Sequence, residues 1–218
     1  MNAREQIVAD VQIALHRKSD SPVTPIPASA RIAPRVAGDA NAEMEMLFSE
    51  ISKLGGVTGR IKKSGLKIAL EKLVKEQKVK QATLWETPEL ENLGVAQTLT
   101  DLGVQLVSPH ADKRVIAECD LGVTGVDCAF PETGTLMLRS SPVKPRAVSL
   151  LPRVHLAIVS PAALRADLGS AFAEAKGSNY WVFVTGPSRT ADIELTVTIG
   201  VHGPKALYAW QVQSQEEP

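Results

Sequence analysis

Hydrophobic positions recur with two different periods along the chain, and the change of period separates helices from strands. Between Ala42 and Leu54 they recur every three or four residues, the spacing of an amphipathic helix, and Gly55-Gly56 ends the pattern. From Leu121 onward, short apolar or alternating runs predominate, as in strands. The pattern predicts further helices at Arg60–Lys78, Pro88–Thr100, Ala111–Cys119 and Pro161–Lys176. It predicts strands at Gln81–Trp85, Val104–Val107, Leu121–Ala129, Thr135–Leu138, Val154–Ser160, Trp181–Val184, Ile193–Val201 and Ala206–Gln211.

One segment indicates how the strands are arranged. The predicted strand Val154–Ser160 leads into the helix Pro161–Lys176, which is followed by the strand Trp181–Val184. A strand, a helix and a strand over this length imply a right-handed parallel crossover. The sequence therefore predicts an α/β fold with a mainly parallel central sheet flanked by helices.

The first 40 residues differ from the rest of the chain. Ala3–Lys18 carries an apolar stripe at helical spacing, and Ser19–Ala40 holds four prolines among small polar residues. Residues 1–40 are therefore predicted to be a helix on a proline-rich linker, and residues 41–218 to be the α/β domain. The first helix packs either on this domain or on a partner.

Composition narrows the functional classes. The 218 residues carry 24 Lys+Arg and 24 Asp+Glu, so a formal net charge of +0 gives no electrostatic reason for general nucleic-acid binding. No apolar run approaches the roughly 18 residues of a membrane span, and the charges among the apolar residues of Met1–Asp10 argue against a secretory signal. Two cysteines provide neither a disulfide framework nor a four-ligand zinc or iron–sulfur set, and the four histidines are scattered. We therefore expect a cytoplasmic protein without a metal site.

Residues 122–135 form the first stretch with candidate chemistry. Pro131 and Gly134 bracket Glu132 and Thr133 in a tight turn between strands. Such turns expose backbone amides, so Glu132 is a candidate nucleophile, general base or hydrogen-bond acceptor. In the alternative interpretation the threonine side chains close a simple hairpin and Glu132 is solvated. The residues alone leave both interpretations open.

A second stretch, Thr185–Glu194, follows the apolar strand Trp181–Val184. Its Gly-Pro-Ser-Arg-Thr loop offers amides, hydroxyl groups and the guanidinium of Arg189, which suit a carboxylate or phosphate. Ligands of open α/β sheets bind at the carboxyl ends of the strands, where this loop is predicted to lie. Asp192 and Glu194 then share one polar strand face, where paired acids can divide acid and base roles.

Single residues elsewhere have weaker signals. His202 lies in a turn bounded by glycines, where a hydrogen-bonded turn residue is the ordinary interpretation. His155 is flanked by apolar residues in a predicted strand, so we expect a hydrogen-bonded core histidine. Cys128 is expected to be a small buried hydrophobic residue rather than a nucleophile.

Four stretches in this order resemble the lactate utilisation (LUD) domain family. They are Gly122–Asp127 with Glu132–Thr135, Leu150–Val159, Gly186–Glu194 and Gly200–Pro204, within a similarity from about Asn41 to Val212. The resemblance implies a NagB/RpiA/CoA transferase-like fold. It further implies one subunit of a three-component iron–sulfur system that oxidises L-lactate to pyruvate, with the clusters on the other two subunits. It leaves open whether this chain itself is an enzyme. The family motif maps onto Thr124, Gly125, Asp127, Glu132, Thr133, Gly134, Gly186, Pro187, Ser188, Arg189, Thr190, Asp192, Glu194, His202 and Gly203.

Three functional hypotheses follow. In the first, the subunit binds a small carboxylate or a cofactor between the loops Glu132–Thr135 and Gly186–Glu194, Arg189 holds the anion, and Glu132 or Asp192 acts as base. In the second, the chain is a stand-alone acyl- or CoA-transferase with Glu132 as nucleophile, as in CoA-transferase relatives. In the third, it isomerises a sugar phosphate. The first depends on Glu132 and Arg189 meeting at one pocket.

Overall fold

The computed structural model describes residues 2–15, 35–174, 180–190 and 198–213. The chain divides into two units, Met1–Ala33 and Pro34–Pro218. In the first unit, the side chain of Asn2 accepts a hydrogen bond from the Glu5 amide and caps helix α1 (Ala3–Ala14). The apolar side chains of α1 are exposed. The predicted helix is thus confirmed up to Ala14, whereas the linker from residue 16 to 34 lies outside the described residues.

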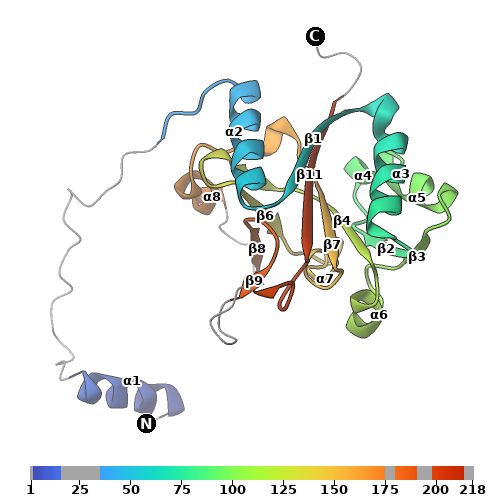
Figure 1. Cartoon of the computed structure of the whole chain (residues 1–218). Coiled ribbons are helices and arrows are strands. Elements are labelled where there is room, and N and C mark those ends of the chain that lie inside the picture. Colours follow the sequence, from blue (N-terminus) through green and yellow to red (C-terminus); the bar gives the residue numbers. More distant parts are fainter. Residues whose placement is uncertain (1, 16–34, 175–179, 191–197, 214–218) are drawn as a thin grey trace. The chain divides into compact units, whose positions relative to one another are not determined.

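Within the described part of the second unit, six parallel strands form the central sheet, in the order β1-β11-β7-β4-β2-β3 (Figure 1). The strands are β1 (Val57–Lys62), β2 (Gln81–Leu84), β3 (Gln105–Val107), β4 (Leu121–Gly125), β7 (Val154–Ile158) and β11 (Ala206–Gln213). The central strands β4 and β7 are buried along their whole length, as strands covered on both faces are. The predicted α/β fold with a mainly parallel sheet is confirmed.

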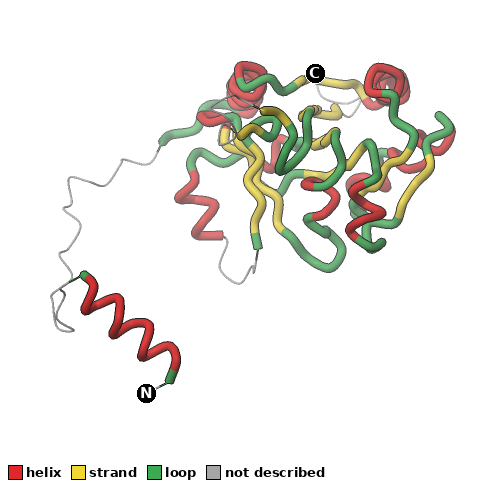
Figure 2. Tube along the Cα trace, turned by 60° about the horizontal axis from the view of Figure 1, so that its bottom comes forward, coloured by secondary structure: helices red, strands yellow, loops and turns green. Residues whose placement is uncertain are grey.

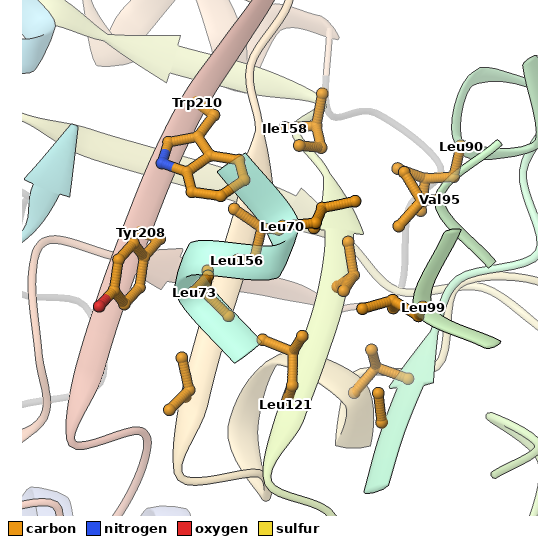
Figure 3. Packing of buried hydrophobic residues seen from close by; sticks show 14 of the residues in the cluster. Leu70, Leu73, Leu90, Val95, Leu99, Leu121, Leu156, Ile158, Tyr208 and Trp210 are labelled. Atoms are coloured by element: carbon orange, nitrogen blue, oxygen red, sulfur yellow. The ribbon is translucent and has the colours of Figure 1, made fainter. Parts of the chain in front are cut away.

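Helices cover one face of this sheet. Leu70 and Leu73 pack with Leu99 against Leu156 and Tyr208 of the sheet, all in one hydrophobic cluster (Figure 3). Burial of such side chains is worth about 1.5–3 kcal/mol each, so this cluster is a main source of stability. The helices on this side are α3 (Leu66–Gln77), α4 (Pro88–Asn92) and α5 (Val95–Asp101).

The opposite face is covered by α2 (Ala40–Lys53) and by a second, antiparallel sheet. Met44, Leu47 and Ile51 of α2 pack against Ala157 and Ala209 of the central sheet. The second sheet has the order β5-β6-β8 in the described residues. Figure 2 shows the strands of the second unit in yellow among its helices in red. Its strands are β5 (Cys128–Phe130), β6 (Thr135–Arg139) and β8 (Trp181–Val184). Cys128 is buried there, as predicted.

The predicted crossover from Val154–Ser160 to Trp181–Val184 is wrong. β8 pairs antiparallel with β6, with Leu136 opposite Val184, and does not join the parallel sheet. An apolar run of four residues does not distinguish a buried parallel strand from a strand of a second sheet. The intervening helix is also interrupted. A 3-10 turn, Pro161–Ala163, precedes an extended Leu164 that bridges to Ala129, and α8 begins only at Leu168 (α8, Leu168–Glu174).

Three further boundaries differ from the prediction. The predicted helix Arg60–Lys78 starts as strand β1, because Val57–Lys62 pairs in parallel with β11 at the sheet edge, where charged residues are tolerated. The predicted helix Pro88–Thr100 is divided at Gly94, which has φ 65. The strand predicted at Leu121–Ala129 is split between the two sheets.

The remaining elements are short. They are α6 (Lys113–Ala117), α7 (Ala147–Leu150), and the antiparallel pair β9 (Arg189–Thr190) and β10 (Thr198–Ile199). Most of the predicted strand Ile193–Val201 lies outside the described residues. Among the helices of the described parts, none is long and apolar enough to cross a membrane.

Candidate functional site

A chain of threonine hydroxyl groups joins the two loops that the sequence singled out. Thr133 donates a hydrogen bond to Oγ1 of Thr135 at 2.8 Å, and Oγ1 of Thr135 lies 2.9 Å from Oγ1 of Thr185. This contact follows from the pairing of β6 with β8, since Thr135 begins β6 and Thr185 directly follows β8. The antiparallel sheet therefore brings the end of the Glu132 turn to the start of the Gly186 loop.

Both loops also pack against the carboxyl end of α2. Gly134 has φ 62, and a Cβ atom there would lie 2.8 Å from the Ile51 amide nitrogen. Gly186 approaches Leu54 in the same way, with 3.2 Å between a Cβ atom and Leu54 Cβ. Arg189 donates a hydrogen bond to the Leu54 carbonyl oxygen. The backbone of both loops thus lies closer to α2 than most side chains would allow.

The second loop is fixed from the other side by the turn before β11. The Ser188 amide donates to the Pro204 carbonyl oxygen at 2.9 Å, and the Gly200 amide donates to the Ser188 carbonyl oxygen at 2.8 Å. These bonds hold the Gly-Pro-Ser-Arg segment beside His202 and Gly203. The Gly186 loop and the turn before β11 are therefore neighbours in the structure.

A cavity of about 250 Å³ opens between these segments. Among the described residues that line the cavity, Arg189 carries a permanent positive charge and none has a carboxylate side chain. The cavity wall therefore favours the binding of an anion. Ser188 adds a hydroxyl group. The cavity is lined by Ser149, Leu150, His155, Phe183, Val184, Thr185, Gly186, Ser188, Arg189, His202, Gly203, Pro204 and Leu207.

The position of the cavity differs from the expectation. His155 and Leu207 lie near the amino ends of β7 and β11, and Ser149 belongs to α7 just before β7. The Gly186 loop does follow the carboxyl end of a strand, but this strand belongs to the antiparallel sheet. The site is therefore not at the carboxyl edge of the parallel strands. It lies where the second sheet meets their amino ends.

His155 is a cavity residue that sequence reasoning did not select. Its ring is buried, with 1% exposure, and Nε2 lies 2.8 Å from Oγ1 of Thr124 on the neighbouring strand. Burial lowers the pKa of His155 to about 4, so the ring is neutral near pH 7. The expected hydrogen-bonded core histidine is thus found, but Nδ1 has no partner in the part of the chain that the structure describes. A polar residue inside an otherwise apolar central strand was the available signal.

Glu132 does not line this cavity. Its side chain is exposed in the 3-10 turn Pro131–Thr133. The Glu43 carboxylate raises the pKa of Arg35 by hydrogen bonding, and the charge of Glu132 adds to this shift. Glu132 therefore lies near the Arg35–Glu43 ion pair, away from the lining of the Arg189 cavity. The structure does not bring Glu132 and Arg189 into one pocket.

Gly125 ends β4 and Asp127 follows two residues later, in a different cluster. Asp127 accepts hydrogen bonds from the Arg139 amide and from Nζ of Lys144, each at 2.7 Å. A Cβ atom on Gly125 would lie 2.8 Å from Oε2 of Glu89. Burial of its carboxyl group raises the pKa of Glu89, Lys144 opposes the shift, and Asp127 adds to it. The contacts of Asp127 stabilise the chain that follows β6.

The other predicted residues have varied positions. Thr190 pairs with Thr198 between β9 and β10. Thr124 is not among the residues that line the cavity, and its hydroxyl group contacts His155, which is. Asp192 and Glu194 lie outside the described residues, so their predicted roles stay predictions.

Comparisons with known proteins agree with the resemblance seen in the sequence. The model of the LUD domain family matches residues 44–209. The chain is 33% identical over 160 residues to lactate utilization protein C of Shouchella clausii, covering 68% of this chain and 70% of that protein. It is 27% identical over 172 residues to lactate utilization protein C of Halalkalibacterium halodurans, and the match covers 74% of this chain and 75% of that protein. A crystal structure of a DUF162 family protein from Deinococcus radiodurans has a similar fold, with a TM-score of 0.57 and 16% identity, over 81% of this chain and all of that one.

Proposed function

Because this chain belongs to the LUD domain family, we propose that it is the carboxylate-binding subunit of a lactate-oxidising system. The relatives named lactate utilization protein C support the metabolic context. The structural support is the cavity, in which Arg189 stands on a wall that is free of carboxylates among the described residues. In this proposal the iron–sulfur clusters reside on partner subunits, and this chain binds the small acid.

The cavity suits this role physically. A guanidinium group offers a planar fork of donors that matches a carboxylate. Within the described residues, Arg189 donates one hydrogen bond, to the Leu54 carbonyl oxygen, and its fork has further donors to offer. The hydroxyl group of Ser188 and the loop amides provide further donors. With about 250 Å³, the cavity is smaller than the roughly 300–1,000 Å³ of sites for drug-sized ligands, so a short acid fits better than a nucleotide-containing one.

The acyl-transfer hypothesis receives less support from this geometry. Its nucleophile, Glu132, is exposed and does not line the cavity. It predicts a glutamyl thioester that hydroxylamine or borohydride would trap at Glu132 during incubation with CoA esters. Mass spectrometry that finds this adduct would favour the transferase over the binding subunit.

Reconstitution tests the proposed role. Cluster-bearing partners, purified with and without this chain, are given L-lactate and an electron acceptor. We expect copurification with the partners and lactate-dependent reduction that requires this chain. Equal rates of lactate oxidation in its absence would refute the subunit role.

A further inference from the structure

Two hollows lie side by side near the β3 edge of the central sheet. The β3 hollow, of about 250 Å³, contains Trp85 and Leu106 and lies at the carboxyl ends of β2 and β3. The α7 hollow, of about 430 Å³, contains Leu151 and lies where α6 and α7 meet. Pro109 lines both hollows, and Nε1 of Trp85 donates a hydrogen bond at 3.0 Å to the carbonyl oxygen of Pro145, which lines the α7 hollow. The two hollows therefore form one continuous surface.

The two hollows carry opposite charge. Among the described residues, the β3 hollow is lined by Glu86 and Glu91 and by no basic side chain. In the same part of the chain, the α7 hollow is lined by Lys113 and Arg146, together with His110, and by no acidic side chain. Glu86 and His110 lie 3.5 Å apart where the hollows adjoin. Lys113, Arg146 and Glu91 form no ion pair with another described residue, so their charges are available to a partner.

Apolar side chains are uncovered on this surface. Within the described residues, β3 is the last strand of the central sheet and pairs only with β2 (Figure 1). Leu106 of β3 is 36% exposed, and Leu151 in the α7 hollow is 38% exposed. Each hollow thus has one exposed leucine. An open strand edge with exposed leucines favours association, because covering them removes apolar surface from water.

We propose that this surface is the interface between two copies of the chain, related by a two-fold axis near Pro109. In such an interface one surface meets itself, so the β3 hollow of each copy faces the α7 hollow of the other. The acidic rim then meets the basic rim twice, with Lys113 of one copy near Glu91 of the second copy. A partner of a single charge sign would instead meet repulsion at one of the two hollows.

The proposed interface adjoins the Arg189 cavity without using the residues that bind the anion. Leu150 of α7 lines both the α7 hollow and the cavity, whereas Arg189 and Ser188 line the cavity and neither hollow. Pairing of two copies therefore covers part of α7 and leaves the anion-binding residues free. The inference does not depend on which acid the cavity binds.

Sedimentation equilibrium of the full chain tests whether a second copy binds. We expect the wild type to form a species of twice the mass of one chain. Lys113→Glu and Glu91→Lys each create two contacts between like charges, one on either side of the axis. We expect each substitution to raise the dissociation constant of the dimer at least tenfold. Lys62→Glu is the control and should associate as the wild type does, because Lys62 is exposed at the end of β1, on the opposite edge of the sheet.

Mixing the two interface variants is the sharper test. A copy with Lys113→Glu and a copy with Glu91→Lys have opposite charges at both contacts, the exchanged pair at one and the native pair at the other. We expect the mixture to dimerise about as tightly as the wild type, which also shows that both variants fold. A mixture that associates as weakly as the single variants would overturn the proposal. A monomeric wild type, or single variants that dimerise as the wild type does, would overturn it as well.

Hydrogen exchange gives a readout that needs no substitution. Amides of residues 105–113 and 145–151 should exchange more slowly as the concentration of the wild type is raised through the range in which the dimer forms. Equal exchange at both ends of this range would place the interface elsewhere and contradict the proposal.

Discussion

Oγ1 of Thr124 and Nε2 of His155 lie 2.8 Å apart between the two central strands of the sheet. The contact is polar, and the buried apolar residues Ala157 and Leu207 lie nearby on the same face of the sheet. Burial lowers the pKa of His155 to about 4. The pair therefore joins β4 and β7 by a buried contact between side chains.

The buried histidine predicts a dependence of stability on pH. The folded pKa of about 4 is below the usual 6.5, so the unfolded chain binds a proton more readily. The stabilisation that comes from keeping the buried ring neutral is fully present above pH 6.5. It is lost as the pH falls toward 4, where the free energy of unfolding is lower by roughly 3 kcal/mol. Urea unfolding at several pH values should show the loss in the wild type and a flatter profile in His155→Gln. Parallel profiles would contradict the neutral buried ring.

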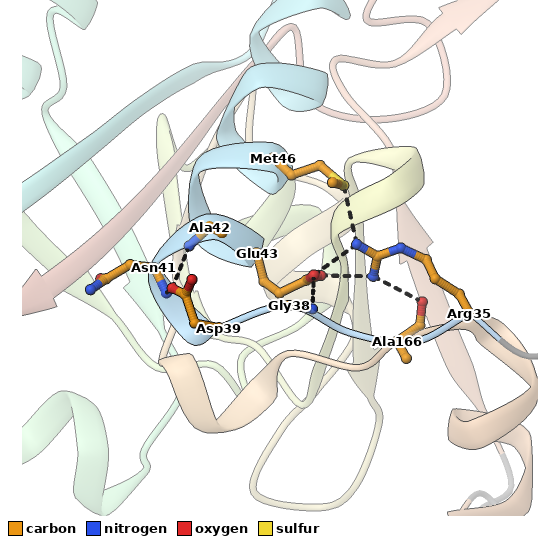
Figure 4. A network of polar contacts seen from close by, with 8 residues as sticks. All are labelled: Arg35, Gly38, Asp39, Asn41, Ala42, Glu43, Met46 and Ala166. Atoms are coloured by element: carbon orange, nitrogen blue, oxygen red, sulfur yellow. Dashed lines mark hydrogen bonds and ion pairs between the residues drawn. The ribbon is translucent and has the colours of Figure 1, made fainter.

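The ion pair between Arg35 and Glu43, in the first turn of α2, predicts a second effect. Glu43 is buried, with 4% exposure, and accepts hydrogen bonds at 2.7 Å from both terminal nitrogens of Arg35 and from the Gly38 amide (Figure 4). Removing one partner of such a pair leaves the other buried and unpaired. We expect Glu43→Gln to lower the free energy of unfolding by about 2–4 kcal/mol.

An exposed glutamate on the same helix, Glu45, provides the matched control. Glu45 is 3.1 Å from Arg60 with its side chain 70% exposed. Glu45→Gln should change the free energy of unfolding by less than about 0.5 kcal/mol. The Arg35 hydrogen bonds also hold the pKa of Glu43 below its usual range. The stabilisation by this pair is therefore present above the ordinary glutamate pKa and is lost in acid. Equal effects of the two substitutions would show that burial does not set the strength of the Glu43 pair.

Asp127 provides a test that separates stability from binding. It accepts hydrogen bonds from Lys144 and the Arg139 amide, but it does not line the cavity. Asp127→Asn should lower the free energy of unfolding by about 1–3 kcal/mol and leave the affinity for small acids unchanged. Denaturant unfolding and calorimetric titration check the two halves of this prediction. A loss of affinity without a loss of stability would assign Asp127 to the binding site.

The glycine in the Glu132 turn predicts a steric effect. Gly134 has φ 62, and a Cβ atom would approach the backbone of Glu50 and Ile51 within 3 Å. Gly134→Ala should therefore destabilise the chain by about 1–3 kcal/mol. Gly65→Ala is the control, because nothing lies within 4 Å of a Cβ atom there and its φ is −94. Thermal unfolding compares the two, and a similar melting temperature for both variants would contradict close packing of the turn on α2.

The hydrophobic pattern predicted the fold class well, because buried runs such as Val154–Ile158 and the amphipathic helix α2 depend on local periodicity. It could not predict which sheet a strand joins. β8 is apolar enough for a central parallel strand, yet it pairs with β6 of the second sheet. β6 is distant from β8 in the sequence, so local periodicity does not show this pairing. β1 was missed for the opposite reason. Its residues Arg60 and Lys62 are charged, and only the pairing with β11 makes that segment a strand.

The candidate site was predicted in part. Arg189, Ser188 and His202 do lie around one cavity, since loops rich in glycine and hydroxyl groups are good indicators of exposed donors. Glu132 also lies in a turn with glycine and hydroxyl groups, but its side chain is exposed and does not line the cavity. His155 was passed over because a single histidine in an apolar strand gives no sign of whether both ring nitrogens are paired. That depends on Thr124, which reaches the ring through the register of β4 with β7.

The most direct test of the account is whether Arg189 binds a small carboxylate. Calorimetric titration with L-lactate should compare the wild type with Arg189→Ala and with Arg114→Ala, which removes the same charge from exposed helix α6. Because Arg189→Ala loses charge-assisted hydrogen bonds to the ligand, we expect its affinity for L-lactate to be at least tenfold lower, with little change in its free energy of unfolding. We expect unchanged affinity in Arg114→Ala. Equal affinity of Arg189→Ala and the wild type would contradict the carboxylate site.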